Sequence, residues 1–432
     1  MADVVVVGAG PVGSLLALTL ARRGYTVDLY ERRPDMRLTG ASAGRSINLA
    51  VSTRGLHALH EVGLDEDVLR EAVPMLGRMT HALDGKLALL LYGRGDRERI
   101  NSMSRTGLNN LLMSRAEETG RVRIHFEQRL LSYDFQRRAA RFASGAEVHA
   151  EVIIGTDGSA SALRASLGGE VSQELLSSGY KELTMPPTPE GEFAMHANAL
   201  HIWPRGTFML IALPNLDRSF TCTLFLALEG SPSLSTLETE AAARRFLERH
   251  FPDAMRLAPG FPAQLVAAPV GRMVTVKAWP WARGSALIIG DAAHCIVPFF
   301  GQGMNAGFED VSLLCGMLSG DWPRDFAAFA AARKPDTDAI ADLAVENFVE
   351  MRDKVADPAF LRLRELEQEL QDRMAGRYLT RYQLVTFTRV PYRVALRVGR
   401  IQQEILGGLL RGEYDFARAE ELVAERISPL IP

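Results

Sequence analysis

The stretch VVVVGAGPVGSLLALTLARRGYTVDLYER, residues 4–32, decides the fold. A β-branched run over residues 4–7 leads into a glycine-rich turn, and the turn leads into the helical pattern SLLALTLARRG. A second strand-like run, YTVDLYER, follows directly. This order predicts a strand, a helix and a second strand, which is the opening unit of an α/β sheet.

The glycines of this turn have the spacing of a dinucleotide site. Gly8 permits the tight turn, Gly10 lets the backbone approach a pyrophosphate, and Gly13 lets helix and strand pack closely. Glu31 ends the second strand, where its carboxylate can accept a hydrogen bond from a ribose hydroxyl and would repel the 2′-phosphate of NADP. The pattern predicts bound FAD or NAD, and a purely structural glycine turn is the alternative.

Two later segments repeat the arrangement of a short buried strand and a polar turn. IIGTDGSASALR, residues 153–164, places Asp157 after its strand, although an ordinary strand-to-helix connection explains that segment equally well. LIIGDAAHCIVPFFGQGMN, residues 287–305, places Asp291 in the same way, where a carboxylate could accept a bond from a polyol hydroxyl. The glycines after Pro298 allow backbone N–H groups to face a ligand.

The composition is that of a globular enzyme. The chain has 432 residues and a net charge of −3, which gives no electrostatic case for binding nucleic acid. Its three cysteines have no CxxC spacing, so neither a metal site nor a disulfide scaffold is indicated, and a reducing cytoplasm fits best. No stretch approaches about 18 uninterrupted apolar residues, so we expect a soluble protein.

The three motifs GAGPVG, TDG and GDAAH, in this order, resemble the class-A flavin-dependent aromatic hydroxylases, which have the para-hydroxybenzoate hydroxylase fold. Arg105, in SRTGLNNLL, matches the start of a helix near the flavin in that family. The resemblance implies tightly bound FAD and argues against NAD as the resident cofactor. The implied cofactor-binding residues are Gly8, Gly10, Val12, Gly13, Tyr30, Glu31, Arg32, Arg33, Ala50, Arg105, Leu130, Asp291, Gly303, Met304 and Asn305.

The implied fold class is α/β, with a Rossmann-like FAD-binding domain, an inserted antiparallel β-sheet substrate domain and a C-terminal helical region. We expect the FAD-binding domain to comprise residues 1–179, with a substrate-contacting segment near 78–92, and to resume over 281–323. The mainly β domain should span 180–280, where the break PPTPEGE is followed by strand-like segments. Residues 324–432 should be helical and complete the substrate pocket.

Further stretches resemble the branch of this family that hydroxylates kynurenine. They are GRSINLA (44–50), NALHIWPRGTFMLIALPN (198–215), VPFFGQGMNAGFED (297–310) and ENFVEMRDKVADP (346–358), none of which has a reason to recur in other hydroxylases. Eukaryotic members carry a membrane-anchoring tail. This chain ends ELVAERISPLIP without an apolar span, so we expect no membrane anchor.

The resemblance assigns the substrate's amino-acid carboxylate to Arg78, Tyr92, Asn347 and Tyr382. A guanidinium can bind a carboxylate through two parallel hydrogen bonds, and a phenol or an amide can add one each. Without the family pattern, an Arg or Tyr in a polar loop is most often only a surface residue. The residues expected to line the pocket around the aromatic ring are Leu200, Met209, Ile211, Leu213, Phe225, Pro298 and Phe299, although ordinary core packing explains their alternation equally well.

The implied reaction is the conversion of L-kynurenine to 3-hydroxy-L-kynurenine. NADPH would reduce the bound FAD, and reduced flavin would react with O2 to give a C4a-hydroperoxide that oxygenates the ring beside the amino group. No acid or base side chain is needed, and the absence of a second GxGxxG agrees with the transient encounter with NADPH that the resemblance implies. Two alternatives remain, a related hydroxylase of a modified kynurenine or other amino-aromatic acid, and a non-catalytic flavin-binding protein.

Overall fold

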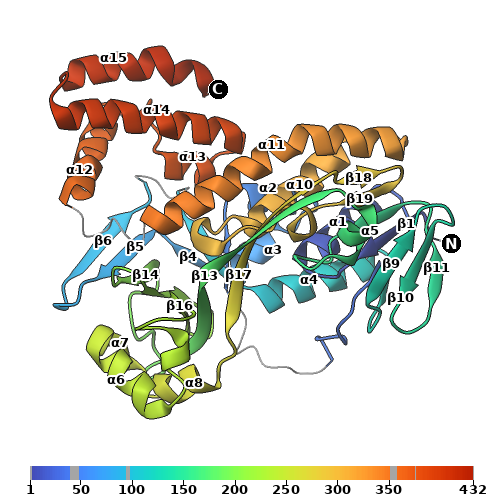
Figure 1. Cartoon of the computed structure of the whole chain (residues 1–432), viewed down its shortest axis with the longest axis horizontal. Coiled ribbons are helices and arrows are strands. Elements are labelled where there is room, and N and C mark those ends of the chain that lie inside the picture. Colours follow the sequence, from blue (N-terminus) through green and yellow to red (C-terminus); the bar gives the residue numbers. More distant parts are fainter. Residues whose placement is uncertain (1, 39–47, 94–97, 351–357, 375, 432) are drawn as a thin grey trace.

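The computed structural model describes residues 2–38, 48–93, 98–350, 358–374 and 376–431 (Figure 1). An α/β domain, an antiparallel sheet with helices packed on it and a C-terminal group of helices make up the molecule. The predicted fold class is therefore confirmed, whereas the exact domain boundaries stay a prediction. Parts of two stretches quoted above, residues 44–47 and 351–357, lie outside the described residues.

The α/β domain is built on a six-stranded sheet assembled from distant parts of the chain. The strand order is β18-β19-β12-β1-β2-β8, and every pairing is parallel except that of β18 with β19. The strands are β1 (Val4–Val7), β2 (Val27–Tyr30), β8 (Val122–His125), β12 (Ile153–Gly155), β18 (Ala282–Arg283) and β19 (Ala286–Ile288). Because β1, β12 and β19 are parallel neighbours, the turns after all three meet at one edge.

The first strand and helix form the centre of this domain. All four residues of β1 are buried, as expected for a strand covered on both faces. Helix α1 (Pro11–Arg22) has apolar residues on almost every side, and residues 13–21 are all buried. Helices α4 (Arg105–Glu118) and α10 (Gly303–Met317) pack against it.

A seven-stranded sheet carries the second part of the molecule, in the order β17-β13-β16-β15-β14-β5-β6. The strands are β5 (Gly77–His81), β6 (Leu87–Leu91), β13 (Glu170–Met185), β14 (Ala199–Pro204), β15 (Met209–Pro214), β16 (Phe220–Ala227) and β17 (Gly271–Trp279). Neighbouring strands are antiparallel, except that β14 and β5 are parallel. The segment near 78–92 therefore belongs to this sheet.

Three helices that the strand pattern did not reveal lie within this mainly β segment. They are α6 (Glu240–His250), α7 (Pro252–Leu257) and α8 (Phe261–Ala267), and they cover one side of the sheet (Figure 1). Strand β13 begins at Glu170, before the expected domain boundary at residue 180.

Two small sheets and several short helices complete the α/β part. The strands are β3 (Asn48–Val51), β4 (Val73–Met75), β7 (Ile100–Ser104), β9 (Leu130–Asp134), β10 (Ala139–Phe142) and β11 (Glu147–His149). The helices are α2 (Thr53–Glu61), α3 (Asp65–Arg70), α5 (Ala162–Leu167) and α9 (Asp291–His294).

The C-terminal region is helical, as predicted. Helix α11 (Trp322–Val349) runs from the α/β domain toward the remaining helices (Figure 1). These are α12 (Pro358–Arg373), α13 (Arg381–Phe387), α14 (Tyr392–Arg411) and α15 (Phe416–Arg426). None of the helices in the described parts of the chain is both long and apolar enough to traverse a bilayer.

A buried polar cluster lies on the face of the seven-stranded sheet that the helices cover. His81 Nδ1 contacts Asp253 Oδ2 at 2.8 Å, and His201 Nε2 donates to the His196 carbonyl at 2.9 Å. His81 Nε2 and His201 Nδ1 are 2.8 Å apart. The two rings therefore join Asp253 and the His196 carbonyl in one chain of polar contacts.

We expect His201 to make the stability of the protein depend on pH. Burial, opposed by the hydrogen bond to the His196 carbonyl, lowers the pKa of His201 from 6.5 to about 4. The unfolded chain therefore binds more protons at this residue between pH 6.5 and 4, and the stabilisation is lost as the pH falls through that window. His201→Gln, which keeps a donor and an acceptor, should remove about 2–3 kcal/mol of this acid-dependent loss at pH 4.

Urea unfolding at several pH values measures this effect. As the pH falls from 6.5 toward 4, the free energy of unfolding of wild type should fall by about 2–3 kcal/mol relative to that of His201→Gln. Parallel pH profiles for the two proteins would show that His201 does not carry the effect.

Candidate active site

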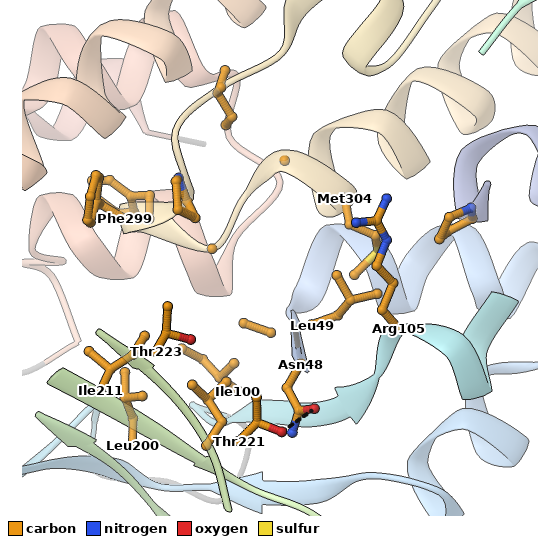
Figure 2. A pocket seen from close by; sticks show the side chains of 18 of the residues that line it. Asn48, Leu49, Ile100, Arg105, Leu200, Ile211, Thr221, Thr223, Phe299 and Met304 are labelled. Carbon is orange, nitrogen blue, oxygen red and sulfur yellow. Dashed lines mark hydrogen bonds between the residues drawn. The ribbon is translucent and has the colours of Figure 1, made fainter. Parts of the chain in front are cut away.

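A cavity of about 330 Å³ lies where the α/β domain, the seven-stranded sheet and the C-terminal helices meet (Figure 2). It extends from the glycine turn at Gly10 to Arg78 and Tyr382. The predicted residues that line it are Gly10, Val12, Ala50, Arg78, Arg105, Leu200, Met209, Ile211, Leu213, Phe225, Asp291, Pro298, Phe299, Gly303, Met304 and Tyr382. Cofactor candidates and substrate candidates thus share one space.

Close packing fixes the glycine turn at one end of this cavity. A Cβ atom on Gly13 would lie 2.0 Å from the Gly8 carbonyl oxygen and 2.4 Å from Thr156 Oγ1. Gly8 has a φ of +102°, and a Cβ there would meet the backbone of Thr156. A Cβ on Gly10, by contrast, meets nothing within 4 Å. Gly8 and Gly13 therefore hold the turn together, while Gly10 leaves space for a ligand.

The Glu31 carboxylate forms a hydrogen bond to the backbone of the same turn. Its Oε2 accepts a hydrogen bond from the Ala9 N–H at 2.9 Å, and its Oε1 accepts from the backbone N–H and Nε of Arg33. The side chain is buried. Oε1 thus accepts two hydrogen bonds, whereas Oε2 accepts one and keeps a further lone pair, so the geometry permits the predicted bond to a ribose hydroxyl.

The N-terminal ends of two helices and two charged side chains at the cavity suit a flavin nucleotide. Helices α1 and α10 both begin at the cavity. The first N–H groups of a helix have no intrahelical acceptor, and in these two helices no capping side chain supplies one. Asp291 and Arg105 face the cavity between them. Burial within the cleft raises the pKa of Asp291, and nearby Arg105 opposes that shift. The available donors and acceptors therefore fit FAD.

The remaining cofactor candidates lie behind or beside the wall. Asn305 is fully buried, with its amide bonded to Ser52 N–H and to the carbonyls of Ala50 and Gly301. It therefore positions the loop. Tyr30 stacks in the core, Leu130 is buried in β9, and Arg32 and Arg33 are exposed at the end of β2.

Arg78 is a charged group at the end of the cavity where the substrate contacts were predicted. Its guanidinium carbon lies 4.3 Å from the Tyr382 ring centroid and 5.7 Å from that of Tyr92. Among the described residues, no carboxylate forms a salt bridge with Arg78, and both Arg78 Nε and Tyr92 Oη are buried without an acceptor. A cation in such surroundings favours an anionic ligand.

Asn347 forms a hydrogen bond to the loop that borders the cavity. Its Nδ2 donates to the Phe299 carbonyl at 2.7 Å, and the ring of the next residue, Phe348, stacks on Phe299 with centroids 4.2 Å apart. Tyr382 stacks on Phe300 of the same loop at 5.6 Å. Tyr92 lies directly behind Tyr382, at 5.5 Å. The structure thus brings all four predicted carboxylate residues to one end of the cavity, with Arg78 and Tyr382 in its wall.

An apolar wall lines the cavity between its two ends. Met209, Ile211 and Leu213 alternate along β15 and all face the cavity, as the period-two pattern predicted. Leu200 and Phe225 extend this surface on the neighbouring strands β14 and β16, and Leu200 and Ile211 are seen together in Figure 2. Pro298 and Phe299 face it from the loop.

The sequence reasoning missed a polar strip on this wall. Thr221 and Thr223 lie on the same face of β16 as Phe225, and Asn48 stands beside them (Figure 2). Asn48 Nδ2 donates to Asn215 Oδ1 at 2.6 Å, and Thr221 Oγ1 donates to Asn48 Oδ1 at 3.2 Å. The alternation FTCTLF carried the signal for the threonines, because the cavity-facing positions of a strand recur every two residues.

Comparison with known proteins agrees with this site. A family model described as an FAD binding domain matches residues 1–320. The kynurenine 3-monooxygenase of Myxococcus xanthus is 50% identical, over 99% of this chain and 96% of the relative. That of Xanthomonas axonopodis pv. citri is 46% identical, over 98% of this chain and 97% of the relative.

Two solved structures share the fold. A mutant 2-methyl-3-hydroxypyridine-5-carboxylic acid oxygenase has a TM-score of 0.68 and 22% identity, covering 83% of this chain and 95% of its own. PqsL of P. aeruginosa, in complex with 2-aminobenzoylacetate, also has a TM-score of 0.68 and 22% identity, covering 82% and 97%. At this identity the likeness concerns the fold alone.

Gly10→Ala should separate FAD binding from folding. Gly10 has an extended backbone, with φ −75° and ψ 178°, so alanine is tolerated there, but its methyl group would occupy the space next to the N-terminus of α1. We expect FAD to bind at least about tenfold more weakly, with an unchanged Tm of the cofactor-free protein.

Gly316→Ala is the matched control, since its Cβ also meets nothing within 4 Å and it lies near the end of α10. FAD titration of both variants, followed by flavin fluorescence, measures the dissociation constants. Equal affinity of Gly10→Ala and wild type would contradict a ligand approach at this glycine.

Proposed function

Because the chain belongs to the kynurenine 3-monooxygenase family of FAD-dependent hydroxylases, we propose that it hydroxylates L-kynurenine to 3-hydroxy-L-kynurenine, with NADPH as reductant and O2 as oxygen source. One oxygen atom enters the ring beside the amino group, and the other leaves as water. The observation that carries the proposal is Arg78, a cation without a partner carboxylate among the described residues, at the end of an apolar cavity. An aromatic amino acid matches both features.

Arg78 and the two tyrosines hold the carboxylate of the substrate in this proposal. The guanidinium supplies the charge, and the rings of Tyr382 and Tyr92, 4.3 and 5.7 Å from the guanidinium carbon, carry the phenols that add hydrogen bonds in this proposal. Burial raises the pKa of Tyr92 well above its ordinary value, so its phenol stays protonated and can donate.

The apolar wall orients the aromatic ring and excludes water. Met209, Ile211 and Leu213 form one side, and Phe299 closes the other. A ring held by its carboxylate at one end can present only a restricted edge to the glycine-rich end of the cavity, which fixes the position that reacts. FAD held by the residues at the N-terminal ends of α1 and α10 would supply the electron transfer from NADPH and the activation of O2.

Water exclusion is the second task of the wall, because water reaching the reacting centre would release hydrogen peroxide in place of product. No side chain has to act as acid or base. Asp291 and Arg105 lie at the cofactor end of the cavity and bind the cofactor in this proposal.

Purified protein with bound FAD should oxidise NADPH much faster when L-kynurenine is added, and 3-hydroxykynurenine should accumulate in step with NADPH consumed. Chromatography of the product, with peroxide measured in parallel, checks the stoichiometry. Stoichiometric peroxide without hydroxylated product would exclude kynurenine as substrate. Comparison of ring-substituted kynurenines separates kynurenine from a modified relative.

Arg78→Met should raise the KM for L-kynurenine at least about thirtyfold, or about 2 kcal/mol, because it removes the charge but keeps most of the side-chain volume. An analogue that lacks the amino-acid carboxylate should bind wild type and variant equally weakly. Arg244→Met, at an exposed position on α6, is the control and should leave KM unchanged. An unaltered KM in Arg78→Met would contradict the assignment of the carboxylate to Arg78.

A further inference from the structure

Gln302 connects the flavin-side loop to the C-terminal helices. It lies between Gly301 and Gly303, which both line the cavity, yet its own side chain is only 1% exposed. Its Oε1 accepts a hydrogen bond from Tyr392 Oη at 3.0 Å, and its Nε2 donates to Ser52 Oγ at 3.4 Å. It does not cap α10, although it occupies the N-cap position. The Gln302 amide therefore links Tyr392 to Ser52.

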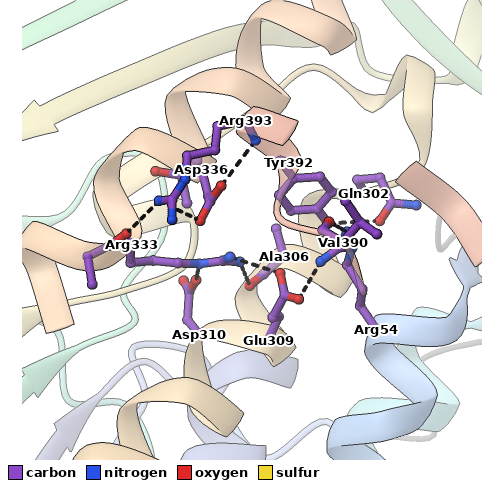
Figure 3. A network of polar contacts seen from close by, with 12 residues as sticks. Arg54, Gln302, Ala306, Glu309, Asp310, Arg333, Asp336, Val390, Tyr392 and Arg393 are labelled. Atoms are coloured by element: carbon purple, nitrogen blue, oxygen red, sulfur yellow. Dashed lines mark hydrogen bonds and ion pairs between the residues drawn. The ribbon is translucent and has the colours of Figure 1, made fainter. Parts of the chain in front are cut away.

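Tyr392 is held in a defined position by Arg54. It is the first residue of α14 and is fully buried, and the Arg54 guanidinium carbon lies 3.9 Å from its ring centroid. Arg54 also bonds to Glu309 of α10 and to the Val390 carbonyl just before α14 (Figure 3). Burial raises the pKa of Tyr392, so its hydroxyl stays protonated and donates to Gln302.

The ion pairs around Tyr392 are buried and compensated. Arg333 of α11 contacts both Glu309 and Asp310 at 2.8 Å (Figure 3). Asp310 also accepts a hydrogen bond from the Gly290 N–H at 2.9 Å. Although burial alone would raise it, His294 and Arg333 hold the pKa of Asp310 at about 2. Such pairs add little net stability but penalise every arrangement that separates them, so they fix the relative placement of α2, α10, α11 and the start of α14.

We propose that Tyr392 is a positioning residue for the loop of Pro298 to Gly303, acting through the Gln302 amide. The loop carries the cavity-facing Gly301 and Gly303, while the position of Gln302 is set from behind by a helix of the C-terminal region. Tyr392 is not among the residues that line the cavity and, in the proposed function on which this inference rests, does not contact the reacting groups. Loss of its hydroxyl leaves a buried carbonyl without a donor, so the loop relaxes and holds FAD less firmly.

Tyr392→Phe tests this with little change in volume, because the ring and its contact with Arg54 remain. FAD binding to the cofactor-free variant should weaken at least about fivefold. In the FAD-bound variant, the visible absorbance bands of the flavin should shift, and the fraction of NADPH oxidised that appears as peroxide should rise. Tyr414→Phe is the matched control, since its hydroxyl donates to the Ile405 carbonyl at 2.9 Å within the same helical region.

A double-mutant cycle with Gln302→Leu separates positioning from general destabilisation. If Tyr392 acts through Gln302, Tyr392→Phe should have little further effect on FAD affinity in the Gln302→Leu background. Wild-type FAD affinity in Tyr392→Phe, an equal loss in Tyr414→Phe, or additive effects in the double mutant would overturn the proposal. The FAD titration uses neither NADPH nor an aromatic substrate, so its outcome does not depend on which substrate the enzyme hydroxylates.

Discussion

The parallel hydrogen bonding of β1 to β12 and of β12 to β19 is the constraint on which the site depends. These strands come from three distant parts of the chain, but parallel pairing brings their carboxyl ends to one edge. The glycine turn, Gly158 and Asp291 consequently border the same cavity. Gly13 packed against the Gly8 carbonyl then fixes how closely α1 can approach this edge.

The second constraint is electrostatic. Arg78 is placed on a strand of the other sheet, between aromatic rings that stabilise a cation but cannot neutralise it. Two other buried arginines, Arg54 and Arg333, each form an ion pair with a carboxylate. Among the described residues, Arg54 and Arg333 are thus neutralised within the protein, whereas Arg78 forms no salt bridge, which is why we propose it as the group that binds an anionic ligand.

The sequence predicted the structural features that depend on the spacing of residues close together in the chain. The glycine turn and the alternation of Met209, Ile211 and Leu213 follow from the periods of turn and strand, and the structure has both. The task of Asn305 did not follow from its motif, because its amide bonds to Ser52 and Ala50, more than two hundred residues earlier in the chain. Helices α6 to α8 were missed because the surrounding strand pattern dominated the interpretation of residues 180–280.

The wall of the cavity beside Arg78 includes Tyr382 of α13, a helix near the end of the chain. During synthesis, the α/β sheet can close once β19 has emerged, whereas the substrate end stays open until α13 has followed and docked. A nascent chain can thus acquire its nucleotide-binding turn before it acquires a substrate pocket.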